Sequence, residues 1–309
     1  MAASKKGGGK KSASKKSASK KSGPKKSSGS GEVYAASADA QLAFALANST
    51  SPFTIEVRFL GGLTQTQMDA FKTAADRWSR IIVGDLPTVN VDGELIDDIV
   101  IQAQGLAIDG PGGVLGQAGP TRLRPAGAGA FGLLPAKGKM AFDTADLKKM
   151  EQAGTLVDVI THEMGHVLGV GTIWRMKGLL KKPGTVNPTF TGKNARREYG
   201  VLRGSGPKDV PVENTGGQGT ADLHWHESVF RNELMTGFVA GAENPLSRMT
   251  IASLQDLGYV VDMNAAEPYS LPNLLSLAES GLMLTTDSPL KMGIMLPNIP
   301  LVLPDDSLQ

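Results

Sequence analysis

The chain has 309 residues with ordinary apolar and charged fractions of 40% and 20%, so one or two domains with a sizeable core are expected. It has no cysteine, which excludes disulfides and thiolate metal ligands. The formal net charge of +2 hides an uneven distribution. Ten lysines and no acid lie in residues 1–31, which leaves a net charge of −8 for the remainder.

Residues 1–31 repeat Lys-Lys pairs among Ser, Ala and Gly. Like charges repel and nothing apolar is available for burial, so we expect a disordered tail. Its lysines fit contact with a polyanion, and a solvated extension is the alternative interpretation. No aromatic residues are interleaved for stacking on bases, so specific nucleic-acid recognition is not expected.

The folded body is expected to begin near Phe53, after a linker at 32–52. Apolar and polar residues alternate from 53 to 59, as in a half-buried strand. Thr64 and Gln67 then form a capping box for an amphipathic helix that we expect to end at Gly84.

Three further segments lie between this helix and residue 143. Ile99–Gln102 is a plausible strand, and residues 105–138 are rich in Gly and Pro and are interpreted mostly as loop. Met140–Asp143 is a possible short strand just before the central motif. Such a strand could pair with an extended substrate or simply form an edge of the sheet.

The central motif is His-Glu-x-x-His at residues 162–166. His162 and His166 are four apart, so on a helix they share one face, roughly 6 Å apart, and can bind one metal ion together. Glu163 is turned part of the way round the helix, where it can reach a water on that ion. Two imidazoles and a carboxylate beside an open metal position describe hydrolytic zinc chemistry.

The surrounding residues support a helix at this motif. Thr155 and Asp158 have the spacing of a capping box at its start. Gly169 stands where the helix would stop, in the position that glycine fills best.

A catalytic zinc site usually has three protein ligands and one water. The chain has four histidines, and the second pair is His224 and His226. The carboxylates of Asp222 and Glu227 compete for the third place, but a third imidazole is the simpler choice. Neutral imidazole also leaves the zinc more positive, which helps to acidify its water.

His-Glu-x-x-His-x-x-Gly, a distant third His and a downstream Met turn resemble the metzincin zinc peptidases, and specifically a leishmanolysin-like enzyme of bacterial type. His224-Trp225 followed by Glu233-Leu234-Met235 carries this resemblance. His224 precedes Met235 by eleven residues, which is the family's spacing, whereas His226 precedes it by nine. The resemblance therefore implies His224 as third ligand and Met235 as the Met turn. His226 stands where the family usually has Glu, and it could orient substrate, stabilise an oxyanion or support the ligands from behind.

The resemblance implies an α+β fold with a metzincin-like arrangement. A twisted mixed sheet with a backing helix and the active-site helix would lie above the cleft, and a mostly irregular lower half would end in a helix near 247–257. The implied organisation is a catalytic domain at 53–263, made of an upper half to about 170, an insertion at 170–222 and a lower half at 223–263. A Leu/Pro-rich C-terminal extension at 264–309 would follow it, which could wrap the lower half or serve attachment or sorting.

The implied function is that of a zinc endopeptidase with one catalytic Zn²⁺, acting on proteins or peptides, with Glu163 as the base for the attacking water. The alternative is a surface-binding or adhesion protein with a structural zinc site, which His226 or Glu227 could close as fourth ligand. No clear signal peptide and no membrane-spanning stretch are found. The family resemblance favours a secreted or cell-surface location, with the cytoplasm as the alternative.

Overall fold

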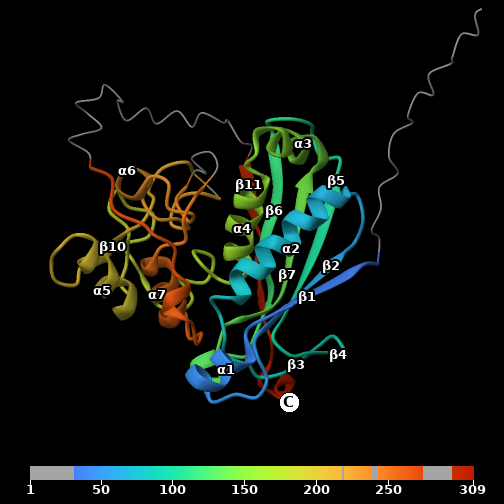
Figure 1. The fold of residues 1–309 in the computed structure, drawn as a ribbon, viewed down its shortest axis with the longest axis horizontal. Helices are drawn as coiled ribbons and strands as arrows, with labels where there is room; N and C mark the ends of the chain where they lie inside the picture. The colour runs from blue at the N-terminus through green and yellow to red at the C-terminus, as the bar shows by residue number, and fades with distance from the viewer. Residues whose placement is uncertain (1–30, 218, 238–242, 274–293) are drawn as a thin grey trace, which may run out of the picture.

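The computed structural model describes residues 31–217, 219–237, 243–273 and 294–309 (Figure 1). Its centre is a seven-stranded mixed sheet. In order across the sheet its strands are β1 (Val33–Ser37), β2 (Thr54–Phe59), β5 (Ile99–Leu106), β7 (Pro135–Asp143), β6 (Val114–Leu123) and β11 (Ile294–Pro297), with β12 (Leu301–Val302) also on β6. β2, β5 and β7 are parallel. β1 runs antiparallel to β2, and β6 runs antiparallel to β7 but parallel to β11 and β12.

The other elements are short or helical. The helices are α1 (Ala40–Ala47), α2 (Gln65–Ser79), α3 (Thr144–Ala153), α4 (Leu156–Val167), α5 (Lys193–Leu202), α6 (Glu227–Phe230) and α7 (Arg248–Leu257). The small strands are β3 (Val89–Val91), β4 (Glu94–Ile96), β8 (Leu180–Lys181), β9 (Thr189–Phe190) and β10 (Val210–Pro211).

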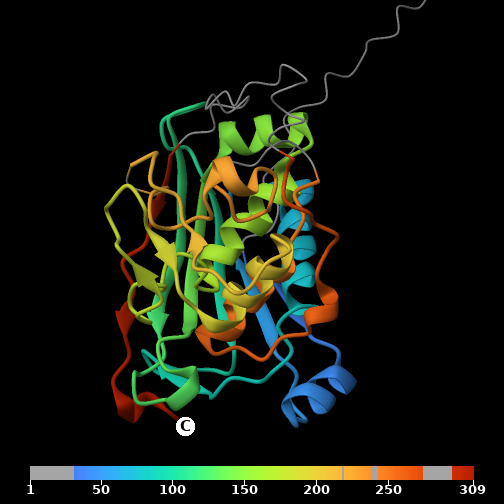
Figure 2. The same cartoon turned by 90° about the vertical axis from the view of Figure 1, so that its left-hand side faces the viewer.

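Helices α2 and α4 lie on the same face of the sheet, and the half that contains α5, α6 and α7 lies beyond α4 (Figures 1 and 2). The close approach of α4 to the sheet depends on Gly138 in β7, where a Cβ would lie 2.3 Å from Cγ1 of Val167. The expected mixed sheet is therefore present, with the helices α2 and α4 packed on one face.

Several elements agree with the sequence. β2 alternates between buried and half-buried residues, as its pattern predicts. Thr64 and Gln67 form the expected reciprocal capping box of α2. The predicted helix at 247–257 is α7, with Ser247 as its N-cap and Gly258 as its C-cap.

The interpretation of residues 105–138 as mostly loop is wrong, because they contain all of β6 and the start of β7. The glycines of β6 are typical of loops, which is why a loop was predicted, yet here they allow a strand to form. A Cβ at Gly116 would lie 2.0 Å from the carbonyl oxygen of Ala141 in β7. The glycine is what lets the two backbones approach.

β7 is not an edge strand, because it lies between β5 and β6. Its backbone edges are already paired, so it cannot add a substrate strand. The prediction that Met140–Asp143 could pair with substrate is therefore wrong.

The end predicted for the backing helix is also wrong. α2 ends at Ser79 with Arg80 as C-cap, not at Gly84. The residues after α2 leave the helix and pair with a distant segment: the backbone N–H of Val83 donates to the Val260 carbonyl.

The two flanking segments are more structured than expected. The linker predicted at 32–52 contains β1, which pairs along its length with β2, and α1. The predicted extension at 264–309 returns to the upper half, where β11 and β12 pair with the outer edge of β6. This pairing satisfies the backbone hydrogen-bonding groups at the edge of β6. Local sequence patterns do not reveal such a contact between distant segments. The Lys-rich tail at 1–30 lies outside the described residues.

Candidate metal centre

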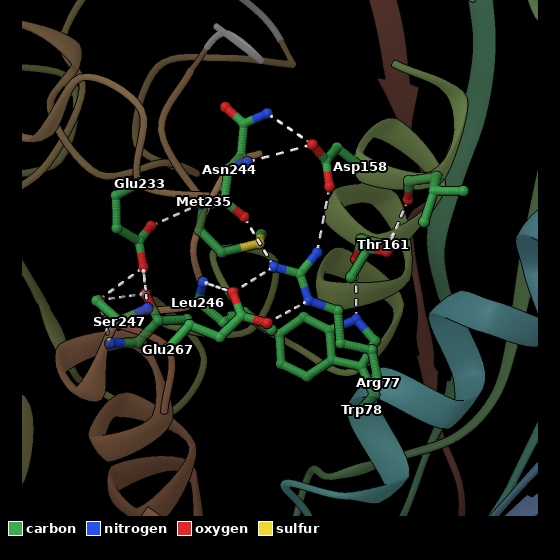
Figure 3. A network of polar contacts seen from close by, with 12 residues as sticks. Arg77, Trp78, Asp158, Thr161, Glu233, Met235, Asn244, Leu246, Ser247 and Glu267 are labelled. Atoms are coloured by element: carbon green, nitrogen blue, oxygen red, sulfur yellow. Dashed lines mark hydrogen bonds and ion pairs between the residues drawn. The ribbon is translucent and has the colours of Figure 1, made fainter. Parts of the chain in front are cut away.

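Helix α4 is held in place from both sides. Trp78 of α2 donates its indole N–H to the Thr161 carbonyl at 2.9 Å (Figure 3). Gly165 lies under this contact, where a Cβ would come within 2.9 Å of Trp78 and 2.8 Å of the Met235 sulfur. Glycine in the last turn of α4 therefore lets α2 and the Met235 segment pack directly on the helix backbone.

The expected capping box at the start of α4 is wrong. Thr155 is the N-cap residue, but its side chain makes no capping hydrogen bond. Asp158 turns instead to Arg77 and Asn244, whose side chains lie 3.3 and 2.9 Å away (Figure 3). The helix start is fixed by these tertiary contacts and by packing.

Three imidazole rings converge at one point. Nε2 of His162 lies 3.0 Å from Nε2 of both His166 and His224, and the last two nitrogens are 2.9 Å apart. All three rings are buried, at 4–6% exposure. The structure thus brings together two residues of α4 and one residue from 58 positions further along the chain.

The tautomers of the three rings follow from their outer contacts. Nδ1 of His162 faces the Leu234 carbonyl at 2.6 Å, that of His166 the Val170 carbonyl at 2.9 Å, and that of His224 the Thr220 carbonyl at 2.9 Å. A carbonyl oxygen can only accept, so each Nδ1 carries the proton. Each Nε2 therefore presents a lone pair to the centre of the cluster.

Burial keeps these rings neutral. It lowers the pKa of His162 to about 3 and that of His224 to about 4, and it lowers the pKa of His166 well below its usual range. No proton is therefore shared among the three nitrogens at neutral pH. Three lone pairs about 3 Å apart repel one another unless a cation lies between them, and neutral imidazole is a preferred zinc ligand. The donor set fits a zinc ion.

Glu163 is on the same helix and is buried at 6% exposure. Burial raises the pKa of its carboxyl group to about 8. A cation nearby would favour the ionised form instead. No hydrogen bond to its carboxylate is found within the part of the chain that the structure describes, so the group is free to act on a bound molecule.

His224 is placed by its neighbours on both sides. The Trp225 N–H donates to the Met235 carbonyl at 2.9 Å, and the Glu213 N–H donates to the His224 carbonyl at 2.9 Å. Gly171, shortly after α4, contacts the segment directly, since a Cβ there would lie 1.9 Å from the Leu223 oxygen.

The predicted supporting residues lie at different distances from the cluster. Met235 is fully buried against Gly165, and Gly169 has a left-handed φ of 106° just after the helix. His226 is 26% exposed and lies 4.0 Å from Glu213. Within the described ranges, no hydrogen bond or ion pair joins His226 to the three converging rings. Neither Asp222 nor Glu227 belongs to the cluster.

Sequence reasoning missed the groups that orient the rings. Three of them are main-chain carbonyls, of Val170, Thr220 and Leu234, which carry no signature of residue type. It also gave no role to Glu233, a fully buried acid one residue before Leu234. Only contacts in the folded chain reveal the three carbonyls, whereas Glu233 belongs to the Glu-Leu-Met pattern that carries the family resemblance.

Comparison with known proteins gives the same indication. The family model described as leishmanolysin matches residues 130–278, which span α4, His224 and Met235. Residues 130–278 are therefore similar to leishmanolysin. Two curated relatives, both named leishmanolysin-like peptidase, come from Caenorhabditis briggsae and Caenorhabditis elegans. Each is 40% identical over 68 residues, which is 22% of this chain and 10% of the relative.

The aligned region thus spans about a tenth of the length of these curated leishmanolysin-like relatives. This likeness agrees with the three histidines that could hold a metal ion. The bacterial type stays a prediction. Among the described residues, no helix combines the length and the apolar character needed to cross a membrane.

Proposed function

We propose that this leishmanolysin-like chain is a zinc-dependent endopeptidase, with His162, His166 and His224 as the ligands of one zinc ion. The observation that carries this proposal is the convergence of three Nε2 lone pairs, each fixed by a carbonyl on the far side of its ring. Bound zinc would lower the pKa of a coordinated water to about 7 and polarise the scissile carbonyl.

Glu163 is the general base in this proposal. It accepts the proton of the attacking water and later delivers that proton to the leaving amine. Its position next to His162, its burial and its lack of a competing partner in the described structure support this role. Substrates would be proteins or peptides.

A structural zinc site in an adhesion protein is less well supported. Such a site is normally closed by four protein ligands. In the described part of the chain the group around His162 contains three candidate ligands, with no fourth His, Asp or Glu. Three ligands leave a position for water, as catalysis requires.

Location and the Lys-rich tail belong to the proposal as well. A secreted or cell-surface location is proposed from the family resemblance. Polyanion contact through residues 1–31 is a separate proposal, which salt-dependent binding of a chain lacking these residues would test.

The proposed base is tested by Glu163→Ala. We expect the variant to retain one zinc ion per chain and to lose about 10²–10⁴-fold in the rate of casein cleavage, because the proton acceptor is gone while the ligands remain. Zinc content is measured by elemental analysis of the same samples. His166→Ala should lose both zinc and activity.

Glu151→Ala, an exposed acid on α3, serves as the matched control and should cleave casein at the wild-type rate. Wild-type activity in Glu163→Ala would show that the base is wrong. A wild-type protein that binds zinc but cleaves no protein would favour the structural site instead.

A further inference from the structure

Glu233 is a charged side chain with no solvent exposure at all. Burying a carboxylate is costly unless donors surround it. Within the described residues, no lysine, arginine or histidine forms an ion pair with it, so hydrogen bonds alone offset the cost of burying its carboxyl group. A buried acid of this kind in the segment that follows the third histidine requires an explanation.

Its donors come from two places. Oε2 accepts the Met235 N–H at 2.7 Å, which closes the turn of residues 233–236, here called the Met turn. Oε1 accepts the Ser247 N–H at 3.1 Å and its hydroxyl at 2.7 Å, at the start of α7 (Figure 3). The Thr250 hydroxyl also donates to Oε1 and itself accepts the indole N–H of Trp225. One carboxylate thus joins the Met turn, α7 and the residue next to His224.

A second polar network holds the other side of the Met turn. Arg77 of α2 binds both carboxylate oxygens of Glu267 and also Asp158 of α4 (Figure 3). Glu267 accepts the Leu246 N–H at 2.7 Å. The adjoining Pro245 carbonyl accepts the Leu234 N–H at 3.0 Å. The turn is therefore fixed between α7 and the pair α2–α4.

The Met turn in turn contacts two ligand-bearing segments. The Leu234 carbonyl accepts the Nδ1 proton of His162 at 2.6 Å, and the Met235 carbonyl accepts the N–H of Trp225, next to His224. Ligand rings are oriented by such outer partners, and losing them typically costs 10–100-fold in metal affinity.

We propose that Glu233 is a positioning residue for the metal centre: its buried carboxylate fixes the Met turn so that the Leu234 carbonyl orients His162 and the Met235 carbonyl orients the His224 segment. This inference rests on the metal site of the proposed function, but not on the peptidase activity. Glu233 touches neither the metal nor substrate.

Glu233→Gln tests the proposal. Glutamine keeps the size of the side chain but turns one acceptor into an NH₂ group, which faces the donors of Met235 or Ser247. We expect zinc affinity, measured by competition with a chelator, to fall about 10–100-fold at a temperature where circular dichroism shows the variant folded. The visible spectrum of the Co²⁺-substituted protein should change, and kcat should fall while KM is retained.

Asp256→Asn is the matched control. Asp256 lies on α7, the helix that Glu233 contacts, and its carboxylate accepts three hydrogen bonds from Asn194 and Ala195 of α5. The control therefore removes a half-buried, hydrogen-bonded carboxylate that does not contact the Met turn. It should keep its zinc affinity within about threefold, less than the loss expected of an outer partner. Zinc binding and the cobalt spectrum are measured without any substrate, so they test the inference even if no peptide is cleaved.

Thr250→Val removes one donor to Glu233 while keeping the shape of the side chain, and it provides the measurement if Glu233→Gln does not fold. It should weaken zinc binding in the same direction by a smaller factor. The proposal is overturned if the folded variants bind zinc as tightly as Asp256→Asn and give the wild-type cobalt spectrum.

Discussion

Main-chain groups orient polar side chains in this structure, both at the histidine cluster and away from it. Each of the three imidazoles gives its Nδ1 proton to a main-chain carbonyl, which leaves the opposite nitrogen as a ligand. Asp143 at the end of β7 is used in a similar way, since its two oxygens accept four backbone N–H groups. These groups come from residues 108 and 110 and from the first turn of α3, so one residue joins a loop to a helix start.

Asp143→Asn tests this use of a carboxylate. Burial by itself raises the pKa of Asp143, but the four N–H donors outweigh it and hold the pKa below its usual range. A lowered pKa means that Asp143 adds stability above the unfolded value of about 3.9 and loses this contribution as pH falls through its folded pKa. The variant should therefore be less stable by about 1–3 kcal/mol at pH 7, with a smaller difference at pH 4 and below.

Urea unfolding of both proteins across this pH range is the measurement. Asp39→Asn is the control, because Asp39 caps α1 in an exposed position and Asn caps a helix equally well. A deficit for Asp143→Asn that stays constant from pH 7 to pH 3 would contradict the assignment.

At the scale of elements, the sequence predicts what is local. Three predicted features depend only on neighbours along the chain, and the elements that carry them are found in the structure. They are the spacing of His162 and His166, the capping box at Thr64 and Gln67, and the apolar periodicity of α7. β6 was missed because its glycines look like loop residues until β7 lies beside them. The three histidines of the candidate site could be predicted because their residue type and spacing are informative. The carbonyls that orient them could not, because main-chain groups carry no residue-type signal and one of the three, that of Leu234, lies 72 residues from its histidine.

Gly171→Ala tests how one element positions another. Gly171 has a left-handed φ of 78°, and its missing side chain makes room for the Leu223 carbonyl just before His224. Alanine would push this segment away from α4, so we expect weaker zinc binding as well as lower stability. Chelator competition and thermal unfolding measure the two effects.

Gly178→Ala separates backbone strain from displacement. Gly178 has a similar φ of 68°, but nothing lies within 4 Å of the position of a Cβ. The free energy of unfolding of Gly178→Ala should fall only by the roughly 1–2 kcal/mol that a left-handed backbone conformation costs alanine. Its zinc affinity should stay at the wild-type value. Equal zinc affinity in the two variants would mean that the contact of Gly171 with Leu223 does not position His224.

The molecule as a whole is assembled so that two distant parts of the chain meet at one point. Helix α4 carries His162 and His166, and His224 lies in the segment before α6. Helix α4 lies between the sheet and the half that contains α5, α6 and α7 (Figures 1 and 2). Arg77, Asp158 and Glu267 join these halves in one ion-pair network. The C-terminal residues complete the sheet edge at β6, so the ends of the described chain also contribute to the upper half.

The most direct test of this arrangement compares His224→Ala with His226→Ala by elemental zinc analysis and chelator competition. The account predicts one zinc ion per chain in the wild type and in His226→Ala. It also predicts that His224→Ala loses zinc affinity by more than the 10–100-fold typical of an outer partner. Unchanged zinc binding in His224→Ala, or its loss in His226→Ala, would contradict the proposed centre.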